Sequence, residues 1–210
     1  MFYFIEKGGP VMWLLLACSL LAGIIFLERL FHFHRAQINA RDFLKGIYNI
    51  LRRNNVVEAV SICEETPGPV AYIVRAAILC HDENRETIAQ AVQDAGLAEV
   101  PRLERNLNML LTIAQLTPLI GLMGTVVGMM QALSSIELQS PLVHSGDLSA
   151  GLWQALITTA SGLAVAIPTY IAYNFLLGRV EGIVLDMERA SGEILSFLLN
   201  QRRRNSGETE

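Results

Sequence analysis

The sequence predicts an all-α membrane protein that crosses a bilayer three times. Its 210 residues are 52% hydrophobic and 17% charged, and the mean hydropathy of +0.39 is higher than a soluble domain of this size tolerates. Three stretches that lack charged side chains are each long enough to span the hydrocarbon core. The net charge of -4 leaves no basic face for a phosphate backbone, so we expect no nucleic-acid partner.

The first predicted span lies within residues 1–34. No residue from Val11 to Leu27 is ionisable. A cleaved signal peptide is the competing interpretation, because "LLLAC" ending at Cys18 resembles a lipoprotein cleavage site. We favour a span that is retained in the mature protein. The charges of Glu6 and Lys7 cancel, whereas the start of a signal peptide is basic, and the apolar run continues well beyond Cys18.

Residues 35–105 predict a small helical domain built on extensions of the membrane helices. After the interruption at Asn54 and Asn55, a helix is expected over 56–65, and "TPGP" then forces a turn. Asp82 or Asn84 caps the next helix, which is expected to continue without a break into the second span. The first helix of the domain is predicted by apolar residues at helical spacing, namely Phe43, Leu44, Ile47, Ile50 and Leu51.

The second and third spans are predicted at 106–136 and 148–178, joined by a hairpin at 137–147. Each is 31 residues long, about 46 Å as a helix against a core of roughly 30 Å, so both should project beyond the bilayer. Residues 179–210 continue as a helix and then a tail, "QRRRNSGETE", that is expected to be disordered. Its Arg202 to Arg204 run predicts a solvated basic end, with contact to anionic membrane lipid as the alternative.

Lysine and arginine beside the spans predict the orientation, because the insertion machinery leaves these residues in the cytoplasm. The hairpin at 137–147 has none. The N-terminus and this hairpin are therefore expected in the periplasm, with the 35–105 region and the C-terminus in the cytoplasm. The flanking basic residues are Arg29, Arg35, Arg41, Lys45, Arg102, Arg105, Arg179 and Arg189.

Small residues form a stripe about 100° wide on each of these two spans, at 100° per residue. The simplest interpretation is close helix packing, because the glycine pair Gly124 and Gly128 lets two helix backbones approach each other. Hydroxyl groups on the stripes and the Gln154 amide also predict a border to a water-accessible pore. Pro118 and Pro168 predict kinks. The stripes comprise Thr117, Gly121, Gly124, Thr125, Gly128, Ala132 and Ser135, and Gly151, Ala155, Thr158, Thr159, Gly162 and Ala166.

Neither of these spans contains an Asp, Glu, Lys, Arg or His, although a proton pump normally carries a titratable group at membrane depth. Any carboxylate that binds protons must therefore come from another subunit. The sequence contains no phosphate-binding loop, catalytic triad or metal-ligand cluster, which predicts no enzyme activity, cofactor or metal site. His32 and His34 are interpreted as interfacial residues rather than metal ligands.

The chain resembles the MotA/TolQ/ExbB proton-channel family, in particular its three-span ExbB/TolQ branch. The resemblance covers almost the whole chain and rests on "KGGPVMW" before the first span, "ERL" at its end, "TPLIGLMGTVVGMM" and "GLWQALITTASGLAVAIPTYIAYN". The pore threonines of the family correspond to Thr125 and Thr159. Where some members have a glutamate in the third span, this chain has Gln154, which excludes proton transfer by ionisation at that position.

This resemblance implies a homopentameric ring in the bacterial inner membrane, with the second and third helices around a central pore. A dimer of single-span ExbD/TolR-like subunits would occupy the pore and supply the missing aspartate, and a TonB/TolA-like transducer would carry the energy onward. Such a motor powers either outer-membrane uptake or envelope maintenance, and the residues do not discriminate between the two. A non-conducting membrane scaffold or assembly factor is the alternative, with the small stripes serving packing alone.

Overall fold

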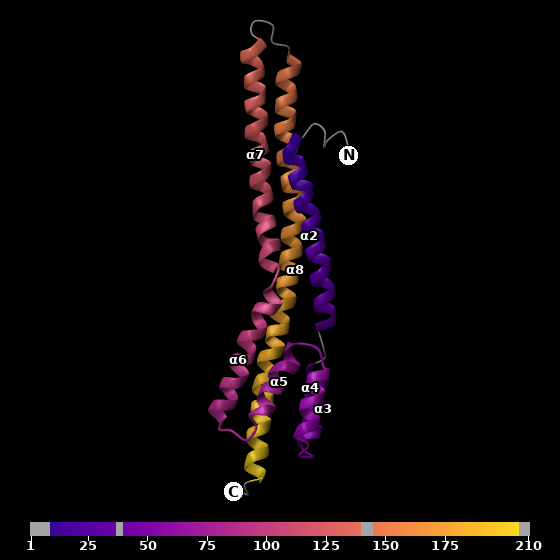
Figure 1. Ribbon diagram of the computed structural model, residues 1–210, viewed down its shortest axis with the longest axis vertical. Helices are drawn as coiled ribbons and strands as arrows, with labels where there is room; N and C mark the ends of the chain where they lie inside the picture. The colour runs from indigo at the N-terminus through magenta and orange to yellow at the C-terminus, as the bar shows by residue number, and fades with distance from the viewer. Residues whose placement is uncertain (1–8, 37–39, 140–144, 206–210) are drawn as a thin grey trace. The chain divides into compact units, whose positions relative to one another are not determined.

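The structure is a computed structural model that describes residues 9–36, 40–139 and 145–205 (Figure 1). Within these residues every regular element is an α-helix, and three helices are long and apolar enough to cross a membrane. This confirms the predicted all-α class with three apolar helices. The chain divides into two compact units, one of Met1–Arg29 and Asn106–Leu176, the other of Leu30–Arg105 and Leu177–Glu210.

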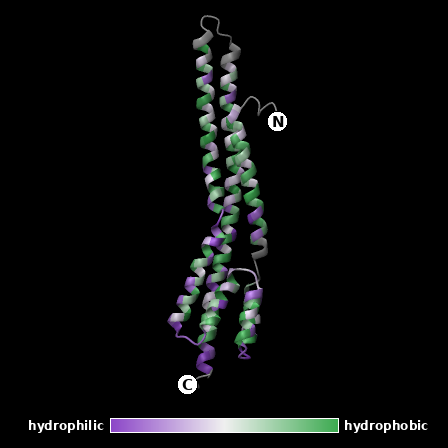
Figure 2. Ribbon diagram, in the orientation of Figure 1, coloured by the Kyte–Doolittle hydropathy of each residue, from purple (hydrophilic) through white to green (hydrophobic). Residues whose placement is uncertain are grey.

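The first unit contains α2 (Gly9–Ala36), α7 (Leu107–Gln139) and the first part of α8 (Ser145–Asn205). Hydrophobic residues predominate along all three (Figure 2), and α8 packs against both α7 and α2. Both long helices continue through their prolines, Pro118 and Pro168. The kinks at these prolines stay a prediction.

The second unit contains α3 (Ala40–Leu51), α4 (Val56–Glu65), α5 (Pro69–Leu79), α6 (Arg85–Glu104) and the last part of α8. Turn and cap chemistry fixes these boundaries. Asn54 adopts a left-handed φ of 57°, and the Asn55 side chain then accepts the N–H of Glu58 at 3.4 Å to begin α4. Gly68, with φ of 125°, precedes the proline that opens α5.

The predicted helix over 56–65 is confirmed, and so is the role of Asn84, whose side chain accepts the N–H of Thr87 at 2.8 Å. The core of this unit is built from the apolar faces of consecutive helices and of α8. That helix buries residues three or four positions apart, as expected for an amphipathic helix. The buried residues of α8 in this unit are Val180, Ile183, Met187, Ala190, Ile194 and Leu198.

Two expectations for the chain are wrong. The helix capped by Asn84 does not continue into the second span, because α6 ends at Glu104 and Asn106 adopts a left-handed φ of 68°. The expected disorder from Gln201 is wrong for residues 201–205, which remain helical within α8. Tertiary hydrogen bonds account for the longer helix, since Gln201 and Arg202 both bond to loops of the second unit.

Candidate functional site

The small residues of α7 meet those of α8 in a close seam within the first unit. A Cβ atom added to Gly162 would lie 2.6 Å from the carbonyl oxygen of Thr117, and one added to Gly124 would lie 2.5 Å from Oγ1 of Thr158. Glycine is therefore the side chain that fits, and the two backbones approach closely. Gly121, Gly128, Gly151 and Ala155 join the same contact, and Ala155 and Ala166 are buried.

Thr158 lies inside the seam. It is 0% exposed, and its hydroxyl donates to the carbonyl oxygens of Ala155 at 2.9 Å and Gln154 at 3.0 Å in its own helix. Its methyl and hydroxyl groups fill the space that Gly124 leaves open. The structure therefore places Thr158 among the packing residues, although the sequence put it with the pore-lining ones.

Thr159 and Thr125 lie at the edge of the seam, where both side chains are half-buried. The Thr159 hydroxyl donates across the seam to the carbonyl oxygen of Gly121 at 3.2 Å. Thr125 follows Gly121 by one helical turn, and its hydroxyl donates to the carbonyl of Leu122 at 2.5 Å. The structure thus brings these two threonines to neighbouring turns of a helix pair that packs through glycine.

Gln154 lies on a different side of α8. Its Nε2 atom is 2.9 Å from the position that a Cβ on Gly9 would take, so the amide packs over the start of α2. At 100° per residue, Gln154 and Thr159 are separated by about 140° around the helix. The amide therefore faces the α2 contact, away from the edge that carries Thr159.

A second contact of α8 with α2 leaves an open groove of about 570 Å³ in the first unit. Small residues, including Gly23 and Ala164, and the aromatic residues Phe26 and Phe175 line it. Pro168 also lines the groove. The groove is almost wholly apolar and offers no reacting group.

The end of α2 is tied to the beginning of α7. The Asn106 side chain donates to Oε2 of Glu28 at 3.2 Å, and the neighbouring Arg29 is buried, with 4% exposed. This bond joins residues 78 positions apart in the sequence. The sequence offered one indication of a break here, because asparagine adopts positive φ more readily than most residues and Asn106 does so.

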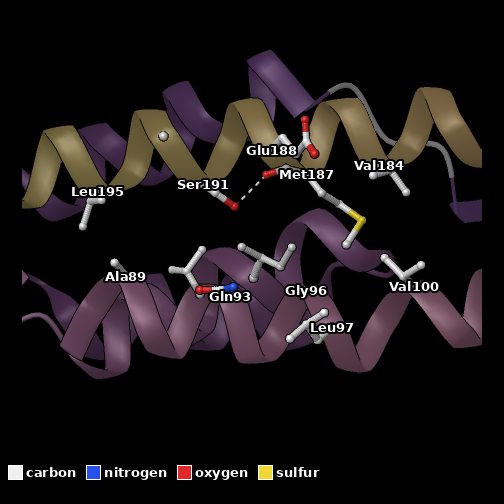
Figure 3. Close-up of a pocket in the computed structure, with 13 residues that line it drawn as sticks. Ala89, Gln93, Gly96, Leu97, Val100, Val184, Met187, Glu188, Ser191 and Leu195 are labelled. Carbon is white, nitrogen blue, oxygen red and sulfur yellow. Dashed lines mark hydrogen bonds between the residues drawn. The ribbon is translucent and has the colours of Figure 1, made fainter. Parts of the chain in front are cut away.

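A groove of about 420 Å³ lies between α6 and α8 in the second unit (Figure 3). Apolar side chains line it from both helices, and Gln93, Glu188 and Ser191 are the polar residues of the lining. Ser191 donates to the carbonyl of Met187 at 2.7 Å, so its hydroxyl is used within α8. The groove holds no cluster of reactive groups.

Two groups of the second unit have raised pKa values. Burial raises the pKa of the Cys63 thiol to about 11, with nearby Arg75 opposing the shift and Glu64 adding to it. Burial also raises the pKa of Tyr48 to about 12, assisted by the negative charge of Glu193 and the 3.5 Å hydrogen bond that Tyr48 donates to it. Both groups are therefore neutral at physiological pH.

The seam between α7 and α8 is the candidate site. It offers hydroxyl oxygens and carbonyls, and neither Leu107 to Ile136 nor Leu148 to Gly178 contains an Asp, Glu, Lys, Arg or His. Among the described residues no group of three or more His, Cys, Asp or Glu side chains is placed to hold a metal ion. Such a seam can pack helices and bind water or a partner side chain, but it carries no proton by its own titration.

Three apolar helices, packed through small and hydroxylated residues, define a multi-pass membrane protein. The sequence profile of the MotA/TolQ/ExbB proton channel family matches residues 65–189, which include both α7 and the seam portion of α8. The chain belongs to this family.

Several relatives are similar along most of the chain. The putative biopolymer transport protein ExbB-like 3 of Synechocystis sp. is 30% identical over 80% of this chain and 80% of the relative. The biopolymer transport protein ExbB of Neisseria meningitidis is 26% identical over 94% of this chain and 96% of the relative. A putative ExbB homolog of Methanothermobacter thermautotrophicus is 25% identical over 84% of this chain, which spans 62% of that relative.

Proposed function

We propose that this chain is the proton-channel and scaffold subunit of an inner-membrane motor of the ExbB/TolQ kind, driven by the proton-motive force. The observation that carries the proposal is the position of Thr125 and Thr159 at the edge of a glycine-packed helix pair. Both lie within the segment that matches the proton channel family. They are the polar groups at this edge to which a proton-bearing partner can bind.

The titratable group comes from another subunit. Placing a charged side chain at the bilayer centre costs about 2.5 to 3.5 kcal/mol on insertion scales, and neither α7 nor α8 carries one over its apolar length. An ExbD/TolR-like subunit with a single span, present as a dimer, supplies this carboxylate. A TonB/TolA-like transducer then passes the energy to an outer-membrane uptake or envelope-maintenance process.

The assembly is a homopentameric ring in the bacterial inner membrane, with the first span within residues 1–34 and the others at 106–136 and 148–178. The N-terminus and the 137–147 hairpin face the periplasm, while 35–105 and 179–210 form the cytoplasmic part. The absence of lysine and arginine from 137–147 supports this orientation. Five copies of the Thr125 and Thr159 edge then surround one pore.

Proton flow down the membrane potential provides the work. One charge that crosses 100 mV releases about 2.3 kcal/mol, which protonates and then frees the partner's carboxylate at the ring. Each cycle rotates or shifts the partner within the pore. In this scheme Gly121, Gly124, Gly128 and Thr158 hold the helix pair together, and Thr125 and Thr159 contact the partner.

The test is a pair of substitutions, Thr125→Val with Thr159→Val, in the complex purified with its partner and reconstituted in liposomes. We expect proton flux to fall at least tenfold while the complex still assembles, because valine keeps the shape and removes the oxygen. Thr112→Val is the matched control. Thr112 is exposed on α7, and its hydroxyl donates to a carbonyl of its own helix, as that of Thr125 does. Wild-type flux in the double variant would remove both residues from the site.

Gln154 is proposed to bind water by hydrogen bonding beside the start of α2. Its half-buried amide has no titratable proton, so it contributes polarity alone. Gln154→Leu should therefore lower proton flux without a change in its pH dependence. Unchanged flux in this variant would reject a role for the amide in the pathway.

A non-conducting scaffold is the second candidate, and the close packing around Thr158 favours it. A scaffold would retain the partner in the purified complex but show no proton flux above that of empty liposomes. The flux measurement on the wild-type complex therefore separates the two proposals.

A further inference from the structure

The groove between α6 and α8 in the second unit follows both helices for about three turns. Its lining runs from Ala89 to Val100 on α6 and from Val184 to Leu195 on α8. Each stretch is about 16 Å long as a helix. Val184 and Val100 lie at one end of the groove, and Leu195 and Ala89 lie at the other, so the two helices are antiparallel (Figure 3). A groove of this length fits one face of a short helix.

The apolar lining of this groove is open to solvent. Leu97, which lines it, is 65% exposed. Gly192 leaves space in the groove, because no atom lies within 4 Å of a Cβ added there. All the lining residues fall outside the three predicted membrane spans, so water rather than lipid covers this surface in a single chain. A concave apolar surface in water is typical of a site that binds another chain.

Four exposed glutamates border the groove on its two helices. Residues seven positions apart are separated by about two turns and lie on the same edge of a helix. Glu86 and Glu104 each lie seven positions from a lining residue of α6, and Glu181 lies seven positions from Glu188, which itself lines the groove. The four exposed residues are Glu86 and Glu104 on α6 and Glu181 and Glu188 on α8.

The chain does not neutralise these glutamates itself. None of them forms a salt bridge within the described residues. Of the four arginines on α6 and on residues 179–199, two pair with other carboxylates of their own helix, and two lie at least 100° around the helix from the glutamate that follows them. The pairs are Arg102 with Glu99 at 2.6 Å and Arg189 with Asp186 at 3.9 Å, and the other two are Arg85 and Arg179.

We propose that this groove binds a basic amphipathic helix, namely the cytoplasmic segment that adjoins the membrane span of the ExbD/TolR-like partner. The end of a single-span protein that lies in the cytoplasm carries lysine and arginine close to the membrane. The groove lies at a matching depth, since Val184 follows Gly178, the predicted end of the third span, by six residues or about 9 Å. Apolar residues of the segment fill the groove, and its basic residues meet the glutamates.

This inference rests on the proposed function, which supplies the single-span partner. The basic run of this chain, Arg202 to Arg204, is the other basic segment that a second copy could offer. Gln201 donates to the carbonyl of Leu51 at 2.7 Å, and Arg202 donates to the carbonyl of Glu83 at 2.6 Å. The end of α8 is therefore bonded within its own unit, and a second copy would have to break these bonds to enter the groove.

The test is photo-cross-linking in the full-length chain co-expressed with its partner. The photoreactive amino acid p-benzoylphenylalanine replaces Leu97 in the groove. It replaces Leu79 in a control, because Leu79 is 59% exposed in the same unit and does not line the groove. We expect a cross-link from position 97 to the partner, within about 20 residues of the cytoplasmic end of its span, and none from position 79.

Two further substitutions test how the segment binds. Gly192→Leu fills the open space of the groove, and Glu188→Lys reverses a charge at its edge. Each should lower the yield of the cross-link from position 97 by about threefold or more. The controls are Gly46→Leu, where an added Cβ also meets no atom within 4 Å, and Glu65→Lys, which is exposed on α4. Both should retain the wild-type yield.

A cross-link from position 97 to a second copy of this chain or to the transducer would overturn the proposal, and so would the absence of any cross-link. If the variant at Leu97 does not assemble, hydrogen exchange of the unmodified chain gives the answer. Exchange over residues 89–100 and 184–195 should slow when the partner is present. Equal exchange with and without the partner would show that the segment does not bind the groove.

Proton flux distinguishes this proposal from the proposed function. A wild-type complex that forms the cross-link but shows no flux supports the groove and rejects the channel. A conducting complex that forms no cross-link from position 97 rejects the groove and leaves the proton channel intact.

Discussion

At Gly162 the seam between α7 and α8 leaves no space for a side chain. A Cβ at this position would lie 2.6 Å from the Thr117 carbonyl oxygen, a backbone atom that cannot rotate away. We expect Gly162→Ala to destabilise the helix pair by about 1 to 3 kcal/mol through overpacking. Detergent denaturation followed by circular dichroism measures this loss.

Gly23→Ala is the control for that experiment. No atom lies within 4 Å of a Cβ added to Gly23, which belongs to the same unit. An alanine there should be neutral or slightly stabilising, since alanine has the higher helix propensity. Equal destabilisation by the two substitutions would contradict the close seam.

Cys63 should make the stability of the second unit sensitive to high pH. Its pKa is raised from 9.0 to about 11 in the folded protein, so the folded state holds the thiol proton more tightly than the unfolded state does. The resulting stabilisation is fully present below pH 9 and is lost as pH rises through 11. Denaturation at increasing pH should show this loss, and Cys63→Ala should remove it.

Slow alkylation gives a second readout of the same burial. At pH 8 the Cys63 thiol, 4% exposed, should react with iodoacetamide more slowly than the half-buried Cys80. Cys80→Ala is the matched variant and should not alter the high-pH behaviour. Alkylation of Cys63 as fast as that of Cys80 in the folded protein would contradict the burial of Cys63.

At this scale the sequence predicted the residue types of the seam but not their separate roles. The stripe geometry identified Gly124 and Gly128 on one face of α7 and Thr159 on one face of α8, because helical periodicity groups residues three and four positions apart. It could not separate Thr158 from Thr159. Adjacent residues differ by 100° around a helix, and only the packed partner decides which of them is covered.

The end of α8 shows how an element can be held by bonds distant in sequence. Gln201 donates to the carbonyl of Leu51 at 2.7 Å and to Oδ1 of Asn54 at 3.1 Å, so it caps the end of α3. We expect Gln201→Ala to destabilise this unit by about 1 to 2 kcal/mol, because a capped carbonyl loses its donor. Hydrogen exchange at residues 52–55 should accelerate in that variant.

The exposed Asn200 provides the control, and Asn200→Ala should leave hydrogen exchange at 52–55 unchanged. Equal exchange in wild type and Gln201→Ala would show that the cap does not hold the turn. Arg202 adds a comparable bond to the Glu83 carbonyl at 2.6 Å in the α5–α6 turn. The basic end of α8 therefore has a structural role that its charge alone did not indicate.

The sequence predicted helix boundaries correctly where a capping residue next to the helix determines its start. Asn84 caps α6, as one of the two residues expected there, and Asn55, expected only as an interruption of the helical pattern, caps α4. The break at Asn106 was not predicted, since hydropathy and charge alone do not reveal a residue that adopts positive φ. Its bond to Glu28 joins positions 78 residues apart, and no local pattern encodes such a pair.

For the whole molecule, the decisive measurement is the native mass of the detergent-purified complex with and without an ExbD/TolR-like partner. We expect a five-fold ring that retains two partner copies, because the Thr125 and Thr159 edge is half-exposed in a single chain. The chain expressed alone is the control and should form the same ring without the partner. A monomer or dimer that ignores the partner would favour the scaffold proposal.

The sequence by itself determined the class of this protein: three apolar helices, two of them without Asp, Glu, Lys, Arg or His over their apolar length, and membership of the proton channel family. Composition and periodicity suffice for these features because they depend on the solvent and on the period of one helix. Only the tertiary structure decided that Thr158 is covered, that Thr159 bonds to Gly121 and that Gln154 faces α2. Those facts depend on which helix lies beside each face, and a single helix does not encode its neighbour.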